Sequence, residues 1–122
     1  MATKDLTLET FQQTIQDGNI VIVDWWADWC GPCKAFAPTF EKKSEEHPDI
    51  VFAKIDTEQE QQLSAMAQIT SIPTLMIFRE GILLFSQAGA LPPAQLEEVI
   101  QATKDLNMDE VRAEIAKQQE EK

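Results

Sequence analysis

The sequence predicts an α/β fold in which helices pack against a central sheet. Segments with apolar residues at helical spacing alternate along the chain with short apolar runs rich in β-branched and aromatic residues. No internal repeat, low-complexity block or Gly/Ser-rich linker divides the 122 residues, so the length suits one main domain. Apolar residues make up 43% of the chain and charged residues 25%, which argues against wholesale disorder.

The first two elements are expected to be a helix and a central strand. Apolar residues recur three and four positions apart from residue 8 to residue 15, and Thr7 is a candidate N-cap. Residues 17–19, with the sequence Asp-Gly-Asn, should end this helix. Residues 20–26 are nearly all apolar, which is typical of a strand covered on both faces.

A long helix and a second buried strand should follow. Phe36 and Phe40 mark the inward face of the helix, and Pro38 inside it should produce a kink. The His47-Pro48-Asp49 segment ends the helix, and we expect His47 to be a solvated loop residue. Residues 50–55 form the next apolar strand.

A third helix, a hairpin and a fourth helix complete the main pattern. Leu63, Met66 and Ala67 mark a third helix, whose remaining residues are rich in glutamine and glutamate. Residues 74–78 and 82–85 are apolar runs joined by a short turn that contains glycine, which predicts an antiparallel hairpin. Pro92-Pro93 should open the fourth helix, since proline is tolerated in a first turn.

The end of the chain is expected to form a separate helical extension. We assign residues 1–106 to the main domain and residues 107–122 to the extension. Asn107 is a candidate N-cap, and Val111 and Ile115 lie four positions apart on one face of the short helix. This helix either packs or is solvated as a cap, or it contacts a partner or a second copy.

Charge excludes some classes of function. Ten basic and 21 acidic residues give a net charge of −11, which argues against binding to nucleic acid or to an anionic membrane. No apolar run reaches the length of about 18 residues that a membrane-spanning helix needs. The first residues lack the apolar segment of a secretory signal, so we expect a cytoplasmic protein.

The Cys30-Gly31-Pro32-Cys33 segment carries the clearest chemistry. Two thiols three residues apart at a helix start can close a disulfide within one turn. The amides of a helix N-terminus favour an anion, so the pKa of Cys30 should lie below the usual thiol value of about 8.5. Cys30 would be the attacking thiolate, and Cys33 would resolve the mixed disulfide. Pro32 stiffens the loop.

Two other interpretations of the cysteine pair are open. A zinc site usually needs two such pairs or added histidines, whereas this chain has two cysteines and a single histidine. The cysteines could also be merely structural. We favour redox exchange and expect no bound metal.

Asp24 stands out because a carboxylate within the apolar run 20–26 would be costly to bury as an anion. It is either a solvent-facing residue near a strand end or a buried acid with a raised pKa that exchanges a proton with the inner thiol. Lys54, in the next apolar strand, is either its partner or a surface lysine at a strand end.

Four segments together resemble the thioredoxin family. They are Asp24-Trp25-Trp26-Ala27-Asp28-Trp29-Cys30-Gly31-Pro32-Cys33-Lys34, Phe52-Ala53-Lys54-Ile55-Asp56, Ser71-Ile72-Pro73-Thr74-Leu75 and Gly89-Ala90-Leu91. The resemblance covers roughly residues 3 to 105. It implies a thioredoxin fold, with a mixed sheet of about five strands and helices on both faces. Thioredoxins are themselves an example of a lowered thiol pKa in a Cys-X-X-Cys motif.

The resemblance also implies roles for individual residues. Cys30 would be the exposed nucleophile and Cys33 the buried resolving thiol. Asp24, coupled to Lys54, would help to deprotonate Cys33. The Ile72-Pro73 bond would be cis and would face the disulfide. An apolar docking surface for substrate would be lined by Trp29, Gly31, Pro32, Ile72, Pro73, Gly89 and Ala90.

The resemblance implies a protein-disulfide reductase that acts in cell redox homeostasis, and we expect the protein to be a monomer. Its partners would be disulfide-containing proteins and a flavin-dependent thioredoxin reductase that draws electrons from NADPH. The chain itself would hold no cofactor. One alternative is a disulfide isomerase or oxidant, and the Gly-Pro sequence between the cysteines argues against it. The other alternative is a non-catalytic interaction module.

Overall fold

A computed structural model of the chain describes residues 2–17 and 19–120. Its helices and strands follow the order predicted from the sequence, preceded by one further strand. They are β1 (Thr3–Asp5), α1 (Leu8–Gln16), β2 (Ile20–Trp26), α2 (Gly31–Glu46), β3 (Val51–Asp56), α3 (Gln61–Met66), β4 (Thr74–Arg79), β5 (Ile82–Ala88), α4 (Pro93–Asp105) and α5 (Met108–Glu120).

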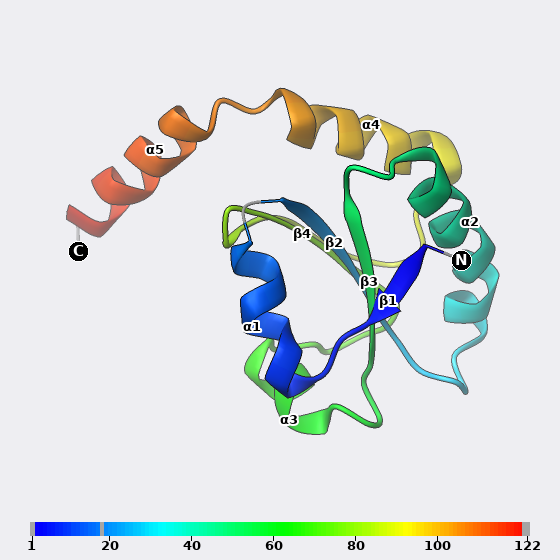
Figure 1. The fold of residues 1–122 in the computed structure, drawn as a ribbon. Coiled ribbons are helices and arrows are strands. Elements are labelled where there is room, and N and C mark those ends of the chain that lie inside the picture. The colour runs from blue at the N-terminus through cyan, green and yellow to red at the C-terminus, as the bar shows by residue number, and fades with distance from the viewer. Residues whose placement is uncertain (1, 18, 121–122) are drawn as a thin grey trace.

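The five strands form one mixed sheet in the order β1-β3-β2-β4-β5. Strands β1, β3 and β2 are parallel, and β4 pairs antiparallel with both β2 and β5. Strand β2 is therefore central, as its unbroken apolar run predicts. The expected mixed five-stranded sheet is confirmed, and the polypeptide after β2 leads directly into α2 (Figure 1).

Helices cover both faces of the sheet (Figure 1). Because side chains alternate along a strand, Val21, Val23 and Trp25 of β2 point to the face covered by α1 and α3. Ile22 points to the opposite face, where it packs with aromatic residues of α2 and aliphatic residues of α4. This second face is the one that matters for the cysteines, since α2 begins at their motif.

Three local expectations differ from the structure. Strand β1 was not anticipated, because its three residues include two charged ones and show no apolar pattern. His47, expected in solvent, is buried, because its ring packs against the later helix α4 and contacts Glu97 and Lys104. Met66, one of the apolar residues that marked the third helix, is nevertheless 67% exposed at the end of α3. The break predicted at residues 17–19 includes Gly18, which lies outside the described residues.

Helix α5 begins where its cap was predicted. The side-chain oxygen of Asn107 accepts hydrogen bonds from the amides of Asp109 and Glu110, at 3.0 Å and 3.2 Å. Val111 and Ile115 are half-buried on this helix. Within residues 2–17 and 19–120, no helix combines the length and apolar character needed to cross a membrane.

Candidate active site

Cys30 and Cys33 form a disulfide at the start of α2. Cys30 is the N-cap residue, with extended backbone angles, and its Sγ accepts a hydrogen bond of 3.1 Å from the backbone amide of Cys33. Pro32 lies in the first turn, where its missing amide proton leaves no helical bond unmade. The helix therefore presents an amide donor and the positive end of its dipole to the outer sulfur.

Both cysteines are buried in this oxidised form. Cys30 is 3% exposed and Cys33 is 2% exposed, and they pack with Ala27, Trp26 and Ile72. The expectation of an exposed Cys30 is therefore wrong for the disulfide state, because the two sulfur atoms cover one another and the neighbouring side chains cover the rest. The cysteines still differ, since Cys30 borders a surface pocket and Cys33 does not.

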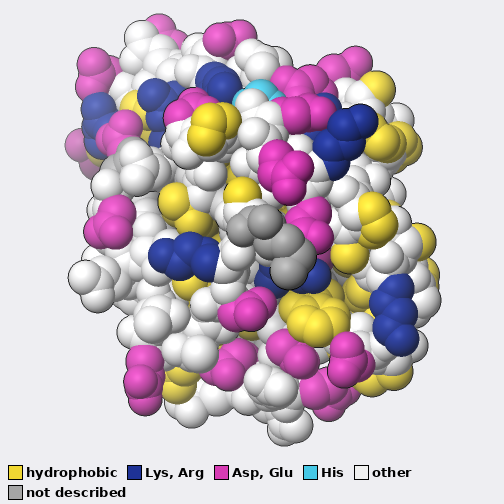
Figure 2. All heavy atoms as spheres, turned by 45° about the vertical axis from the view of Figure 1, so that its right-hand side comes forward, with side chains coloured by type: hydrophobic (Ala, Val, Ile, Leu, Met, Phe, Trp, Pro, Cys, Tyr) yellow, Lys and Arg dark blue, Asp and Glu magenta, His cyan; other side chains and the backbone are white. Residues whose placement is uncertain are grey.

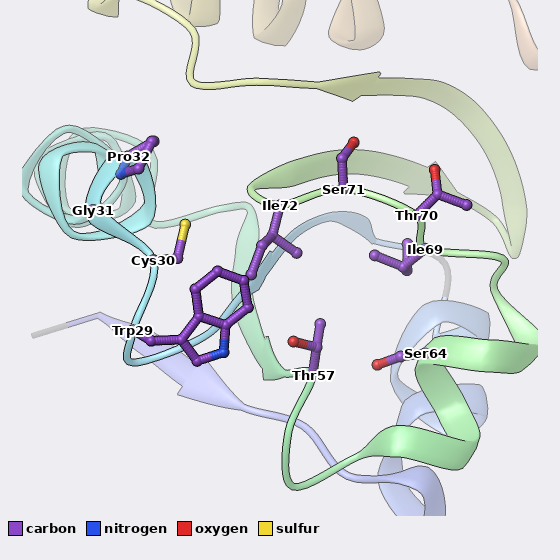
Figure 3. Close-up of a pocket in the computed structure, with 10 residues that line it drawn as sticks. All are labelled: Trp29, Cys30, Gly31, Pro32, Thr57, Ser64, Ile69, Thr70, Ser71 and Ile72. Atoms are coloured by element: carbon purple, nitrogen blue, oxygen red, sulfur yellow. The ribbon is translucent and has the colours of Figure 1, made fainter.

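The pocket beside Cys30 has a volume of about 370 Å³. In Figure 3 the indole of Trp29 lies between Cys30 and Thr57, with Ile72 beside its ring. Of the seven predicted docking residues, the structure brings four to the pocket and leaves Pro73, Gly89 and Ala90 outside its lining. The lining residues are Trp29, Cys30, Gly31, Pro32, Thr57, Ser64, Ile69, Thr70, Ser71 and Ile72.

The Trp29 side chain is 69% exposed and is anchored by one hydrogen bond. Its indole Nε1 donates a hydrogen bond of 2.8 Å to the Glu58 carboxylate. Glu58 is a site residue that sequence reasoning missed, because it lies in an acidic and glutamine-rich stretch that reads as a solvated face. Only the folded chain brings it to Trp29, which lines the pocket.

Asp24 is buried in the middle of the sheet, only 1% exposed. By the alternation along β2 it shares a face with Ile22, the face that α2 covers. Neither carboxylate oxygen has a hydrogen-bond partner among the described residues. Burial raises the pKa of Asp24 from 3.8 to about 7, and the positive charge of Lys54 lowers it in part. The interpretation of Asp24 as a solvent-facing residue is therefore wrong.

Lys54 lies opposite Asp24 in the register of β2 and β3. Its ammonium nitrogen is 4.7 Å from the centroid of the Trp26 ring, a distance typical of a cation–π contact. The structure thus places Lys54 beside Asp24, and it acts on the carboxylate through space.

The Ile72–Pro73 peptide bond is cis, as the family resemblance implies. The backbone amide of Gly89 donates a hydrogen bond of 2.8 Å to the carbonyl oxygen of Pro73. Gly89 has a φ of +101°, a conformation that favours glycine. Gly89 therefore holds the end of β5 against the segment that enters β4, and Ala90 is exposed next to it.

Glu46, His47 and Glu97 form the one cluster in the described part of the chain that could offer three ligand atoms to a metal ion. The ammonium group of Lys43 lies 3.0 Å from a carboxylate oxygen of each glutamate. The imidazole Nε2 of His47 lies 2.9 Å from Glu97. A cation would therefore have to displace the lysine, and the cluster is better described as an ion-pair network.

Comparisons of the sequence and of the structure with known proteins point to the same family. Residues 2–102 match the family model described as Thioredoxin. The chain is 52% identical over 118 residues to a Streptomyces coelicolor protein named "Putative thioredoxin 2", covering 97% of this chain and 88% of that protein. It is 41% identical over 97 residues to the thioredoxin of Alicyclobacillus acidocaldarius, covering 79% and 92%. A solved structure of Plasmodium falciparum thioredoxin superposes with a TM-score of 0.76 at 33% identity, covering 82% and 98%.

Proposed function

Because this chain belongs to the thioredoxin family and is a thiol–disulfide oxidoreductase that reduces protein disulfides, we propose that Cys30 is its nucleophile and Cys33 its resolving thiol. The observation that carries this assignment is the asymmetry between the two sulfurs. Cys30 borders the pocket, and its Sγ accepts a hydrogen bond from the Cys33 amide at the start of α2. These features favour a thiolate at the position that a substrate can reach.

The proposed reaction transfers two electrons in two exchanges. The Cys30 thiolate attacks one sulfur of the target disulfide, which breaks that bond and releases the other target sulfur as a thiolate that takes up a proton. Cys33 then loses its proton and attacks the Cys30 sulfur in the mixed disulfide. The second target thiolate leaves and is protonated, and the Cys30–Cys33 disulfide remains.

We assign Asp24 the role of proton acceptor for Cys33. With a pKa of about 7, its carboxylate exists in both protonation states near neutral pH, which suits a group that takes and returns a proton. It shares the sheet face that α2 covers, and Cys33 lies in the first turn of that helix. Lys54 would tune this group by its charge.

Substrate docking is assigned to the surface around the pocket. Trp29, Gly31, Pro32 and Ile72 line the pocket and would contact the target on either side of its disulfide. Pro73, Gly89 and Ala90 would hold the target backbone beyond the lining, where Gly89 is hydrogen-bonded to Pro73.

The proposed electron donor is a flavin-dependent thioredoxin reductase that uses NADPH, while the chain itself holds no cofactor. Reduction of protein disulfides requires a compartment with a supply of reducing equivalents, and we therefore place the protein in the cytoplasm. We propose separately that it acts as a monomer. The domain assignment, with residues 1–106 as the catalytic unit and residues 107–122 as an extension, belongs to the same proposal.

The test uses single cysteine variants of the full chain in insulin-disulfide reduction with NADPH and thioredoxin reductase. Cys33→Ser should stop turnover and accumulate a mixed disulfide with the target, whereas Cys30→Ser should stop turnover without one. Rapid alkylation of the reduced wild type at neutral pH should modify Cys30 before Cys33. Preferred labelling of Cys33, or normal turnover by Cys33→Ser, would contradict the assignment.

A further inference from the structure

We propose that the C-terminal groove binds a basic, amphipathic segment of a partner protein. By the C-terminal groove we mean two adjoining hollows of about 280 Å³ and 370 Å³ between β5, the end of α4 and α5. Leu84 and Leu106 line both hollows, so the two form one continuous apolar depression. Val111 and Ile115 extend it along α5.

The groove begins at the end of the sheet opposite the disulfide. Ile82 at the start of β5 pairs with Arg79 at the end of β4, and Arg79 pairs with Ile20 at the start of β2. The cysteines follow the other end of β2. A partner in the groove would therefore leave Cys30 open to a disulfide substrate, and the groove is separate from the docking surface proposed above.

Contacts from the β4–β5 hairpin hold the walls of the groove together. The guanidinium of Arg79 donates to the carbonyl oxygens of Thr103 and Leu106, at 3.0 Å and 3.2 Å, where α4 ends. Arg112 of α5 forms ion pairs with Glu80 of the hairpin turn and with Asp109. The groove is thus built into the fold, and a partner would bind a preformed surface.

The groove leaves apolar side chains in water. Leu83 is 47% exposed and Leu106 is 39% exposed. Strand β5 is also an edge of the sheet, with pairing on one side only. Such a combination of exposed leucines beside an open strand edge is a surface that gains free energy when a partner covers it.

Charge decides the kind of partner. Glu98, Glu110 and Glu114 line the groove, are exposed, and form no ion pair within the described residues, while no lysine or arginine lines either hollow. A second copy of the chain would bring a net charge of −11 against this acidic rim. Acidic side chains are also spread across the face drawn in Figure 2. An occupant with apolar residues flanked by lysine or arginine satisfies both the leucines and the glutamates.

The test measures binding of a helical peptide of leucine and lysine to the full oxidised chain by titration calorimetry, beside a leucine–glutamate peptide of the same pattern. The double variant Glu110→Lys/Glu114→Lys should weaken binding of the lysine peptide by about tenfold or more. The control Glu9→Lys/Glu45→Lys makes the same change in net charge at exposed positions on α1 and α2. Its loss of affinity for the lysine peptide should be several-fold smaller, because these positions lie outside the groove that the peptide contacts.

A second variant tests the apolar part of the groove. Ile115→Ser should also weaken binding of the lysine peptide. Insulin reduction and the helical content measured by circular dichroism should stay unchanged. The proposal would be overturned if Glu9→Lys/Glu45→Lys lost as much affinity for the lysine peptide as the groove variant, or if Ile115→Ser lost none. Either result would mean that the peptide binds by nonspecific charge attraction. A groove-dependent dimer in sedimentation experiments would overturn it in favour of a second copy.

Discussion

Lys54 lies directly opposite Asp24 in the pairing of β2 with β3, yet its ammonium group sits 4.7 Å from the centroid of the Trp26 ring. The carboxylate therefore receives no hydrogen bond from a described residue. The result is a balance in which burial raises the pKa of Asp24 and the nearby positive charge limits the rise to about 7. Trp26 packs against the disulfide as well, so the lysine, the indole and the sulfurs form one contiguous group.

The first prediction is that Asp24→Asn stabilises the oxidised protein at neutral and alkaline pH. The folded-state pKa of about 7 lies above the unfolded value of 3.8, so the folded state holds a proton that the unfolded state releases between these values. Wild-type stability should therefore fall as the pH rises from about 4 to about 7. The gain in Asp24→Asn should grow from near zero to as much as about 4 kcal/mol. Denaturant unfolding across this range measures it, and a gain that does not vary with pH would contradict the assignment.

The same variant should slow disulfide exchange. Without a proton acceptor, resolution of the mixed disulfide by Cys33 should lose about ten- to a hundredfold in rate, and the pH–rate profile should lose its inflection near pH 7. Stopped-flow reduction of a protein disulfide measures both. An unchanged profile would show that Asp24 has no part in proton transfer.

Removal of the lysine charge should raise the pKa of Asp24 further. In Lys54→Met the burial of the carboxylate is unopposed, so the inflection in the pH–rate profile and in the NMR titration of Asp24 should move to higher pH. Lys42→Met is the matched control, since Lys42 is exposed on α2. A shift of the same size in both variants would mean that only the total charge matters.

Glu58 should act as a positioning residue through Trp29. Glu58→Ala removes the acceptor of the indole hydrogen bond, so KM for a protein disulfide should rise about two- to fivefold while kcat changes little. Glu58→Gln keeps an acceptor oxygen and should restore most of the loss. The neighbouring exposed residue Gln59 supplies the control variant Gln59→Ala. A fall in kcat alone would argue against a role in docking.

The network around Glu97 should stabilise the fold in a pH-dependent way. Hydrogen bonds from Gln101, His47 and Lys43 lower the pKa of Glu97 from 4.5 to about 2. The stabilisation is present above about pH 4.5 and is lost as the pH falls toward 2. Because this side chain is only half-buried, Glu97→Gln should cost about 1 kcal/mol at neutral pH and progressively less in acid. Glu98→Gln, on the adjacent exposed position, should show neither effect in chemical denaturation.

The sequence predicted the elements that depend on local patterns. Periodicity placed the helices and central strands, and the spacing of Cys30 and Cys33 at a helix start indicated their chemistry. The apolar residues on both sides of Asp24 raised the possibility of a buried acid. Asp24 is indeed buried, because β2 lies at the centre of the sheet. In each case the information lies within about ten neighbouring residues.

What the sequence did not predict depends on contacts between distant segments. His47 follows a helix in a His-Pro-Asp segment that looks like a loop, and it is buried because α4 supplies Glu97 and Lys104, some fifty residues later. Strand β1 is defined only by its pairing with β3. Glu58 carries no local signal, since its partner Trp29 lies in the loop before α2.

The hydrogen bond from the Cys33 amide to the Cys30 sulfur has a consequence for turnover. The dipole that would solvate an anionic sulfur is already aimed at it while the bond between the cysteines is intact. An electron donor that opens the disulfide would therefore release a Cys30 sulfur whose negative charge already faces a hydrogen-bond donor.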